Sequence, residues 1–449
     1  MTDLSVEQPA TVRDRAKDSP RRQRTFTSEI HHLPFAKLAR ALTETAGLAR
    51  SPQRLLPLIY KLSSDSLRLT LARPHLYSYS RTKRSSKEAL DLLLRWIYDA
   101  QRPDGGIAAC YSLLSGYSQS YPEVTGYIIP TLYEYAKTAG DQRALRIAEH
   151  ATQWLLSLQM PEGAFPAGLH GREARSSVFN TGQILHGLVR AYRETHSAEI
   201  LNSAIAAGDW LIGMQQPEGS WSGPAAYQQT THTYYSMVAW SLAELSELVE
   251  HRNAKEHYGA AAERNLDWVS PQFCRNGWID GINLRGHPTY LHFVAYVLQG
   301  VLECGVLRRR NDAVDAVKKP AWVLLRGFET TKFLPGAFET DFKTGLRFTC
   351  LTGSAQMSCV WLRLYEITGD LRYLNAALKM NEMLKELLPV RGGKGIVGGV
   401  SGSFPIWGRY QPLRYISWGC KFFADALLLE QRVTDSWQTF ENEVLPCAS

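Results

Sequence analysis

The sequence lacks the features that mark several large classes of protein. No hydrophobic signal segment opens the 449-residue chain and no apolar run is long enough to span a bilayer, so we expect a cytoplasmic protein. The seven cysteines form no CxxC pair and have no zinc-ligand spacing, which predicts reduced thiols and no dedicated metal site. The glycine-rich stretch 392–402 lacks the GxxxxGKS/T pattern of a phosphate-binding loop, so we expect a mobile flap there.

What the chain does contain is a repeated unit that a tryptophan marks. Trp96, Trp154, Trp210 and Trp268 follow one another at intervals of 58, 56 and 58 residues. The second and third open the similar segments WLLSLQMPEGAF and WLIGMQQPEGSW. A fixed period of this size is typical of one supersecondary unit used several times.

Each repeat has the pattern of a helix, a glycine-containing turn and a second helix. Apolar residues precede the tryptophans at helical spacing, and Pro-Glu-Gly or Pro-Asp-Gly ends the first helix. A threonine stands where the second helix begins, and we expect its hydroxyl to cap that helix. First helices are predicted near 86–101, 142–159, 197–215, 255–270, 310–328 and 370–388, with partners near 121–138, 177–195, 231–250, 288–306, 351–368 and 414–432.

Twelve alternating helices can close into a double ring, so we predict an all-α (α/α)6 toroid over residues 83–435. The alternative is an open solenoid, whose two ends would need polar caps. Residues 28–82 are expected to form a helical extension, and 436–449 a C-terminal tail. Residues 1–27 are polar and basic within a chain of formal net charge +7. We expect a disordered tail there without a nucleic-acid role, because short basic ends are usually solvated.

The repeat motif W-L-x3-Q-x3-G-x-F/W, at Trp154–Phe165 and Trp210–Trp221, resembles the glutamine–tryptophan repeat of the terpenoid cyclase and protein prenyltransferase toroid superfamily. This resemblance implies the fold. It does not extend to the reaction, because the chain has no acidic DxDD proton donor and no zinc-ligand spacing. The missing zinc ligands also argue against a zinc-dependent prenyltransferase or lanthionine cyclase.

A second resemblance concerns the C-terminal half. Segments 289–305, 347–370 and 402–410 are similar to uncharacterised toroid proteins of bacterial extracellular-polysaccharide biosynthesis. The resemblance implies a glycan as substrate and an association with polysaccharide biosynthesis machinery. Because carbohydrate-active hydrolases, lyases and epimerases all use (α/α)6 toroids, the fold alone does not select a reaction.

In a double ring, the loops that enter the inner helices meet at one face. We expect the second helix of each pair to be the inner one, with its N-terminal residues and preceding loop lining a funnel. Aromatic side chains there can stack on sugar rings, and arginine can bind a carboxylate through two hydrogen bonds. The lining therefore predicts an acidic glycan as ligand. The predicted substrate-binding residues are Tyr121, Asn180, Arg172, His287, Tyr290, His292, Gln356, Trp407, Arg409, Tyr410, Trp418 and Lys421.

Two acid–base schemes fit these residues, and neither needs a redox cofactor. His232 with Tyr234 and Tyr235 could abstract the proton beside a uronate carboxylate, as β-elimination and C5 epimerisation require. The carboxyl pair that glycoside hydrolysis requires could come from the predicted catalytic acids Glu123, Asp280 and Asp341. Each residue also has a structural alternative, because an acid such as Glu123 favours a helix N-terminus without any catalytic role.

Two further functions stay open. One is an enzyme that acts on an isoprenoid, whose funnel should be lined by apolar rather than polar side chains. The other is a non-catalytic glycan-binding subunit, which needs the aromatic and basic residues but no acid–base group within reach. The observation that separates them is whether Glu123, His232, Tyr234 and an arginine meet in one pocket.

Overall fold

The computed structural model describes residues 52–71, 84–172, 175–282 and 284–444. Contacts divide the chain into two units, residues 1–55 and 56–449. The predicted basic tail 1–27 lies outside the described residues. Of the predicted extension 28–82, the described part is helix α2 (Pro52–Leu71).

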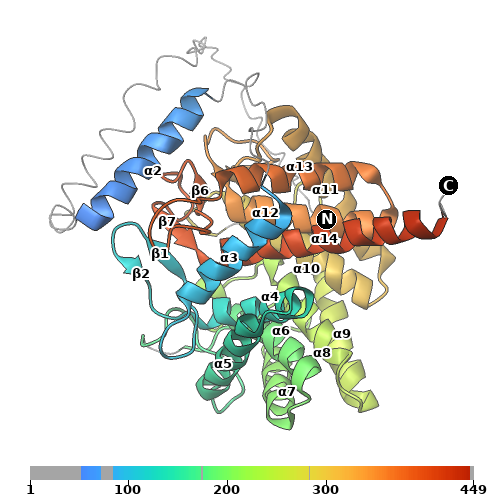
Figure 1. Cartoon of the computed structure of the whole chain (residues 1–449). Helices are drawn as coiled ribbons and strands as arrows, with labels where there is room; N and C mark the ends of the chain where they lie inside the picture. Colours follow the sequence, from blue (N-terminus) through green and yellow to red (C-terminus); the bar gives the residue numbers. More distant parts are fainter. Residues whose placement is uncertain (1–51, 72–83, 173–174, 283, 445–449) are drawn as a thin grey trace, which may run out of the picture. The chain divides into compact units, whose positions relative to one another are not determined.

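Residues 86–444 form six consecutive helix pairs within the described chain (Figure 1). The first members are α3 (Ser86–Ala100), α5 (Gln142–Leu158), α7 (Ala198–Gly213), α9 (Arg252–Val269), α11 (Asn311–Thr331) and α13 (Leu371–Leu387). The second members are α4 (Pro122–Ala139), α6 (Val178–Thr195), α8 (Ser236–Ser246), α10 (Leu291–Leu307), α12 (Leu351–Thr368) and α14 (Ser417–Val444). Short 3-10 helices η2 (Tyr227–Gln229), η3 (Thr233–Tyr235) and η4 (Ser270–Gln272) lie in the loops.

The six second helices form the inner ring. Each contacts the next, from α4 through α6, α8, α10 and α12 to α14, and α14 returns to contact α4. The first helices pack against them from outside. This closure excludes the open solenoid and confirms the predicted (α/α)6 toroid. Helix α8 is shorter than predicted at both ends, starting after η3 at Ser236 and ending at Ser246, and α14 runs to Val444, past residue 435.

Short antiparallel strands tie the long loops together at one end of the ring. Within the described residues, β1 (Cys110–Ser112) pairs with β2 (Gly116–Tyr117) and with β7 (Arg414–Ile416), which joins the first repeat to the last. Strand β3 (Thr289–Tyr290) pairs with β4 (Ala337–Phe338), and β5 (Thr349–Cys350) pairs with β6 (Ser403–Phe404). Loops of neighbouring repeats, and those of the first and last repeats, therefore hold one another.

The glutamine of the repeat motif joins neighbouring repeats. Gln159 Nε2 donates to Gly163 O at 3.0 Å and to Ser203 O, on outer helix α7, at 2.9 Å. Gly163 has a φ of +96°, and a Cβ there would lie 2.3 Å from Ala206 O. Gln215 repeats the arrangement one unit later, with Gly219 O at 3.1 Å and Ala261 O at 2.9 Å. The motif is thus explained by packing between outer helices.

The threonines of the second helices are not caps, and that prediction was wrong. Helix α4 has Tyr121 at its N-cap, and Thr125 lies one turn further in. Thr125 Oγ1 donates to Tyr121 O at 2.8 Å and accepts from Ile107 N at 2.9 Å. Thr181 likewise accepts from Phe165 N at 2.9 Å. These hydroxyls satisfy a buried N–H of the preceding loop, which fixes the loop to its helix.

The predicted mobile flap at 392–402 is also wrong, because the second half of this stretch is packed against outer helix α3. Trp96 Nε1 donates to Gly395 O at 2.8 Å. A Cβ at Gly398 would lie 2.1 Å from Leu92 O, so only glycine allows this approach. Residues 398–402 are buried. The first repeat's tryptophan therefore anchors the stretch and helps to close the ring.

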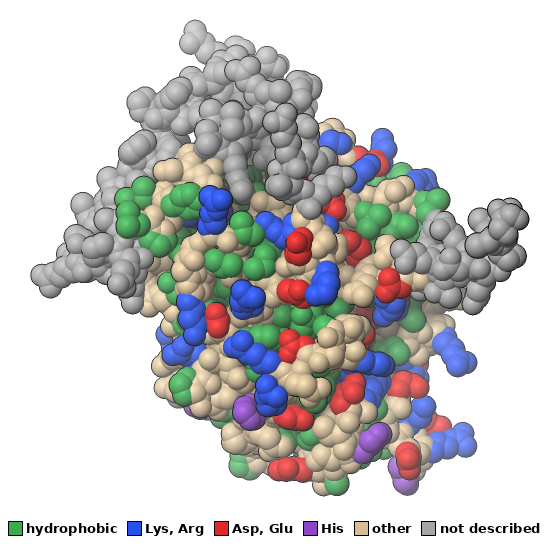
Figure 2. Space-filling view, in the orientation of Figure 1, with side chains coloured by type: hydrophobic (Ala, Val, Ile, Leu, Met, Phe, Trp, Pro, Cys, Tyr) green, Lys and Arg blue, Asp and Glu red, His purple; other side chains and the backbone are tan. Residues whose placement is uncertain are grey.

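One face of the molecule shows no sign of a nucleic-acid site (Figure 2), and the described residues show none of a membrane span or a metal site. On the face shown in Figure 2, basic and acidic side chains are interspersed, as on an ordinary solvated surface rather than a nucleic-acid-binding stripe. Among the described residues, no helix is long and apolar enough to cross a bilayer. The same part of the chain contains no group of three or more His, Cys, Asp and Glu placed to hold a metal ion.

Candidate functional site

The two ends of the inner ring carry very different loops. Loops that lead into inner helices are long, for example 159–177 before α6 and 388–416 before α14. Links from inner to outer helices are short, for example 140–141 and 369–370. The N-termini of the inner helices, with their partial positive charge, therefore face the end where long loops can enclose a ligand.

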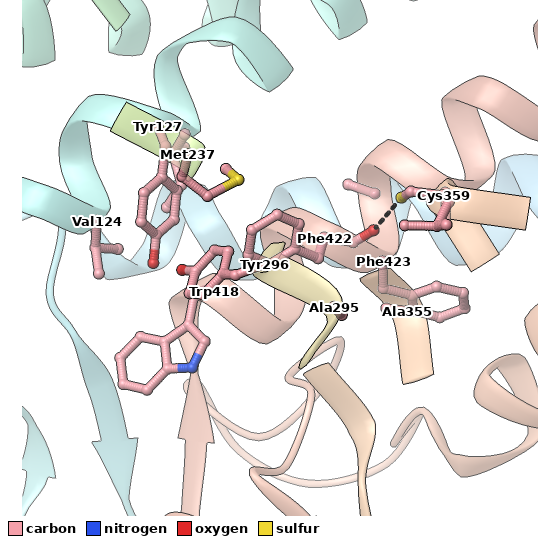
Figure 3. Packing of buried hydrophobic residues seen from close by; sticks show 14 of the residues in the cluster. Val124, Tyr127, Met237, Ala295, Tyr296, Ala355, Cys359, Trp418, Phe422 and Phe423 are labelled. Atoms are coloured by element: carbon pink, nitrogen blue, oxygen red, sulfur yellow. Dashed lines mark hydrogen bonds between the residues drawn. The ribbon is translucent and has the colours of Figure 1, made fainter. Parts of the chain in front are cut away.

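Aromatic side chains fill the centre of the inner helix ring, below the N-termini of these helices. Phe179 lies 5.1 Å from Tyr234 and 5.4 Å from Tyr296, measured between ring centroids. Phe422 lies 5.8 Å from Tyr127 and 5.8 Å from Tyr296. Figure 3 shows Tyr127, Tyr296, Phe422 and Trp418 gathered from α4, α10 and α14. We call these rings the aromatic floor, and they pack edge to face or at a tilt below the predicted funnel.

Sequence analysis missed this floor, although a signal for it was present. Three of its rings lie one helical turn after a predicted site residue. Tyr127 follows Glu123, Tyr296 follows His292 and Phe422 follows Trp418, each at a spacing of four. Residues four apart share a helix face, so the face that carries the predicted site continues inward as an aromatic column.

Glu123 lies at the start of α4 and is only 9% exposed. Tyr121 Oη donates a hydrogen bond of 2.6 Å to Glu123 Oε2. Burial raises the pKa of this carboxyl from its usual 4.5 to about 7, against the opposing effect of the Tyr121 hydrogen bond. Among the described residues Glu123 forms no ion pair. A carboxyl in this state can donate or accept a proton near neutral pH.

The hydroxyl of Tyr121 is held by its surroundings. Its pKa is raised well above the usual value, first by burial and then by the charge of Glu123, so it stays protonated and remains a donor. Asn180 also hydrogen-bonds to Tyr121. Asn180 in turn is fixed, because its Nδ2 donates to Pro166 O at 3.1 Å and its Oδ1 accepts from Ser177 Oγ at 3.1 Å.

His232, Tyr234 and Tyr235 lie together, as the sequence predicted. The His232 ring stacks on Tyr234 at 4.9 Å and 22°. His232 Nε2 lies 2.9 Å from Tyr227 O, while Nδ1 is buried without a partner among the described residues. Burial lowers the pKa of this imidazole. Because a carbonyl can only accept, the neutral ring carries its proton on Nε2 and leaves a lone pair on Nδ1.

A third group surrounds His292 on α10. His292 Nδ1 lies 2.6 Å from Gln356 Oε1, and burial lowers the pKa of the imidazole to about 4. The ring of Tyr410 lies 5.6 Å from His292 and 5.1 Å from Tyr290. Tyr410 Oη accepts from Trp418 Nε1 at 2.9 Å. Five predicted binding residues are thus brought together from the three inner helices α10, α12 and α14, strand β3 and the loop before α14.

The remaining predicted residues lie elsewhere. Asp280 and Asp341 are exposed, and their oxygens accept from Cys274 Sγ at 3.5 Å and from Asn276 Nδ2 at 2.9 Å. Neither contacts Glu123. Lys421 forms an ion pair of 2.6 Å with Asp425 in the wall of the ring. Arg172, His287 and Arg409 are exposed and Trp407 is half-buried, all in loops at the inner-helix N-termini.

The fold places the chain in the class of (α/α)6 toroids. No family model matches the sequence, and no curated protein matches it. Among solved structures, it is similar to an unsaturated glucuronyl hydrolase specific for heparin, with 13% identity, 78% of this chain and 98% of that chain covered, and a TM-score of 0.63. A cellobiose 2-epimerase from Bacillus thermoamylovorans B4167 gives 13% identity, the same coverage and 0.60.

A third similar structure is the unsaturated glucuronyl hydrolase of Bacillus sp. GL1, described as responsible for the degradation of glycosaminoglycan. It shares 15% identity over 78% of this chain and 98% of that chain, with a TM-score of 0.59. At these identities the likeness concerns the fold, and it covers nearly the whole length of each of the three structures.

Proposed function

We propose that the chain is a carbohydrate-active enzyme that modifies an acidic, uronate-containing glycan, with Glu123 as the proton-transferring group. The observation that carries the proposal is a buried carboxyl, at the loop-rich end of the ring, that forms no ion pair with any described residue. Burying such a group costs stability, and a carboxyl kept half-protonated near pH 7 has the property that acid–base catalysis requires. A purely structural carboxyl would be expected to have a cationic partner.

The surroundings of Glu123 support a sugar as ligand. Burial, and to a smaller extent the nearby charge of Glu123, raises the pKa of Tyr234, Tyr296 and Tyr410, so their hydroxyls stay protonated. Aromatic faces bind the apolar faces of sugar rings, and protonated phenols donate hydrogen bonds to sugar oxygens. These neighbours fit a hydroxyl-rich ligand better than an isoprenoid.

The basic loops support an acidic group on that ligand. Arg172, Arg285 and Arg409 are exposed and lie in the loops that precede α6, α10 and α14. Burial raises the pKa of Tyr290, and the charge of Arg409 opposes that effect. Burial lowers the pKa of His232, and the charge of Arg285 lowers it further. A uronate carboxylate can be bound by such guanidinium groups while the sugar ring lies over the aromatic floor.

Hydrolase or epimerase chemistry fits best. A protonated Glu123 can donate to a glycosidic oxygen or a double bond, and an ionised Glu123 can remove a proton from carbon. His232, with its free Nδ1 lone pair, is the second candidate base, assisted by Tyr234 and Tyr235. The similar structures include hydrolases and epimerases of carbohydrates, which is support by analogy of fold. Asp280 and Asp341 do not contact Glu123, so either could take part only after bound substrate had reached it.

The resemblance to toroid proteins of polysaccharide biosynthesis points to the source of the glycan. Its segments 289–305, 347–370 and 402–410 contain His292, Gln356 and Tyr410, which lie together in the site. We therefore place the substrate in bacterial extracellular polysaccharide, with the enzyme acting beside the biosynthetic machinery. Fragments of such polymers are therefore among the substrates to test.

The experiment is incubation of the protein with uronate-containing polysaccharides and oligosaccharides in deuterated water. Deuterium at the carbon beside the carboxylate indicates epimerisation, new reducing ends indicate hydrolysis, and ultraviolet absorbance of unsaturated products indicates a lyase. Each should be lost in Glu123→Gln and kept in Glu134→Gln, which changes a carboxylate at the other end of α4. Saturable binding without turnover of any substrate would contradict the proposal and favour a glycan-binding subunit.

A further inference from the structure

Helix α2 lies outside the six helix pairs, yet one of its faces is buried. Leu58 is 1% exposed, Lys61 8% and Asp65 0%. Lys61 Nζ donates to Asp65 Oδ1 at 2.6 Å, one helical turn away. A fully buried ion pair is expensive unless its remaining atoms are also satisfied, so the other oxygen of Asp65 needs a partner.

That partner is the backbone of the loop before α14. Ile406 N donates to Asp65 Oδ2 at 2.9 Å. The carbonyl of the same residue accepts from Leu413 N at 2.9 Å. Both backbone groups of Ile406 are therefore fixed, one by the carboxylate of α2 and the other across the loop. An amide that donates to a buried carboxylate makes a charge-assisted hydrogen bond, which is stronger than a neutral one.

The loop fixed in this way carries a residue of the candidate site. Ser403 Oγ donates to Tyr410 O at 2.7 Å, which ties the two sides of the loop together. Tyr410 Oη then accepts from Trp418, and the Tyr410 ring lies against His292 and Tyr290. A continuous chain of contacts thus runs from Asp65 on α2 through loop 403–413 to the site.

We propose that Asp65, charge-balanced by Lys61, is a positioning residue that holds loop 403–413 in the conformation that presents Tyr410 to the site. Helix α2 is then a working part of the enzyme rather than an appendage of the ring. The role of Tyr410 toward substrate rests on the proposed function, whereas the effect of Asp65 on the loop does not. Removal of the carboxylate leaves the Ile406 N–H buried without its acceptor.

Hydrogen exchange of the folded protein, read by mass spectrometry of peptides that cover 403–413, tests the positional part. We expect Asp65→Ala to speed exchange in this loop by about tenfold or more, the effect of losing a hydrogen bond to a charged group. Asp65→Asn should give a smaller increase, since its amide oxygen can still accept from Ile406 N. Glu303→Gln, which removes an ion pair to Arg363 at the other end of the ring, should leave the loop unchanged.

Kinetics on the substrate found by the panel separate this proposal from the proposed function. Asp65→Asn should raise KM by about tenfold with kcat within about twofold of wild type, because the loop binds and the reacting groups stay in place. Glu123→Gln should abolish turnover and leave the exchange of the loop at its wild-type rate. Wild-type exchange of 403–413 in Asp65→Asn and Asp65→Ala would overturn the positioning role. If Asp65→Ala does not fold, the result for Asp65→Asn decides.

Discussion

Charged side chains at the two ends of the inner helices have different kinds of partner. Toward the C-terminal ends, ion pairs join neighbours around the ring. Arg190 of α6 binds Glu134 of α4 at 3.0 Å, and Arg363 of α12 binds Glu303 of α10 at 2.7 Å. At the N-terminal end, Glu123 accepts from a tyrosine and forms no ion pair with any described residue. Carboxylates that hold the ring are paired, whereas the carboxyl that we assign to chemistry is not.

The same contrast is visible for histidine. His186, in the middle of α6, has a carboxylate partner on the next helix, with Nδ1 2.6 Å from Glu244 Oε2. His232 and His292, at the loop-rich end, face carbonyl or amide oxygens and have lowered pKa values. His186 joins two inner helices, whereas burial keeps His232 and His292 neutral at neutral pH by lowering their pKa values. The difference in partners agrees with our assignment of His186 to structure and of His232 and His292 to the candidate site.

The largest expected effect comes from removing the unpaired carboxyl. Glu123→Gln should lower kcat by about a hundredfold or more, the usual contribution of a general acid or base. Glu134→Gln, on the same helix, should change kcat by less than about threefold because its carboxylate is remote from substrate. Steady-state rates of the two variants on one substrate make the test. Equal losses would remove the distinction between the two ends.

The pH dependence of stability gives the next largest effect. The pKa of Glu123 in the folded chain is raised, to about 7, so the folded state binds this proton more tightly than the unfolded state does. The folded state then loses stability as pH rises from about 4.5 to 7, by about 3 kcal/mol in total, and the loss persists above pH 7. Urea unfolding at pH 5 and pH 8 should show this difference in wild type and a smaller one in Glu123→Gln.

The helix pairs were predictable because their signals are local. Trp154, Gln159 and Gly163 recur with their neighbours at a fixed period, and each has a packing reason that repeats from unit to unit. The threonine prediction was wrong for a tertiary reason. Thr125 and Thr181 satisfy N–H groups 18 and 16 residues away, and no local rule for helix capping contains such a partner.

The candidate site was only partly predictable. Six inner-helix N-termini at one end of a ring bring Glu123, His232 and His292 to the same region, and that follows from topology. The burial that raises the pKa of Glu123 does not, because it depends on rings such as Tyr296 that arrive from other helices. Asp65 gave no signal at all, since its partner Ile406 lies 341 residues away.

A smaller effect is expected from breaking a pair at the opposite end. Glu303→Gln removes a carboxylate that is 13% exposed and binds Arg363, which also binds Glu366. We expect the free energy of unfolding to fall by about 2 kcal/mol, because a largely buried guanidinium loses one of its partners. Catalysis should stay within about twofold of wild type, since nothing at the loop-rich end moves. A loss of activity at full stability would contradict the assignment of this end to structure.

The smallest expected effect comes from a change beside Glu123, namely loss of its hydrogen bond from Tyr121. The hydrogen bond from Tyr121 lowers the pKa of this carboxyl, in opposition to burial. Tyr121→Phe removes the hydroxyl and keeps the ring, so the pKa of Glu123 should rise further and the pH–rate profile should move toward higher pH. The limb of the profile that reports Glu123 should shift while the maximal rate falls by about tenfold or less, the range for loss of one hydrogen bond between neutral groups. The control is Tyr133→Phe, which changes a buried tyrosine ten residues after Glu123 on the same helix and should leave the profile in place. An unshifted profile in Tyr121→Phe would mean that another group, with His232 the first candidate, sets the pH dependence, and the proton-transferring role would then pass from the carboxyl to the imidazole.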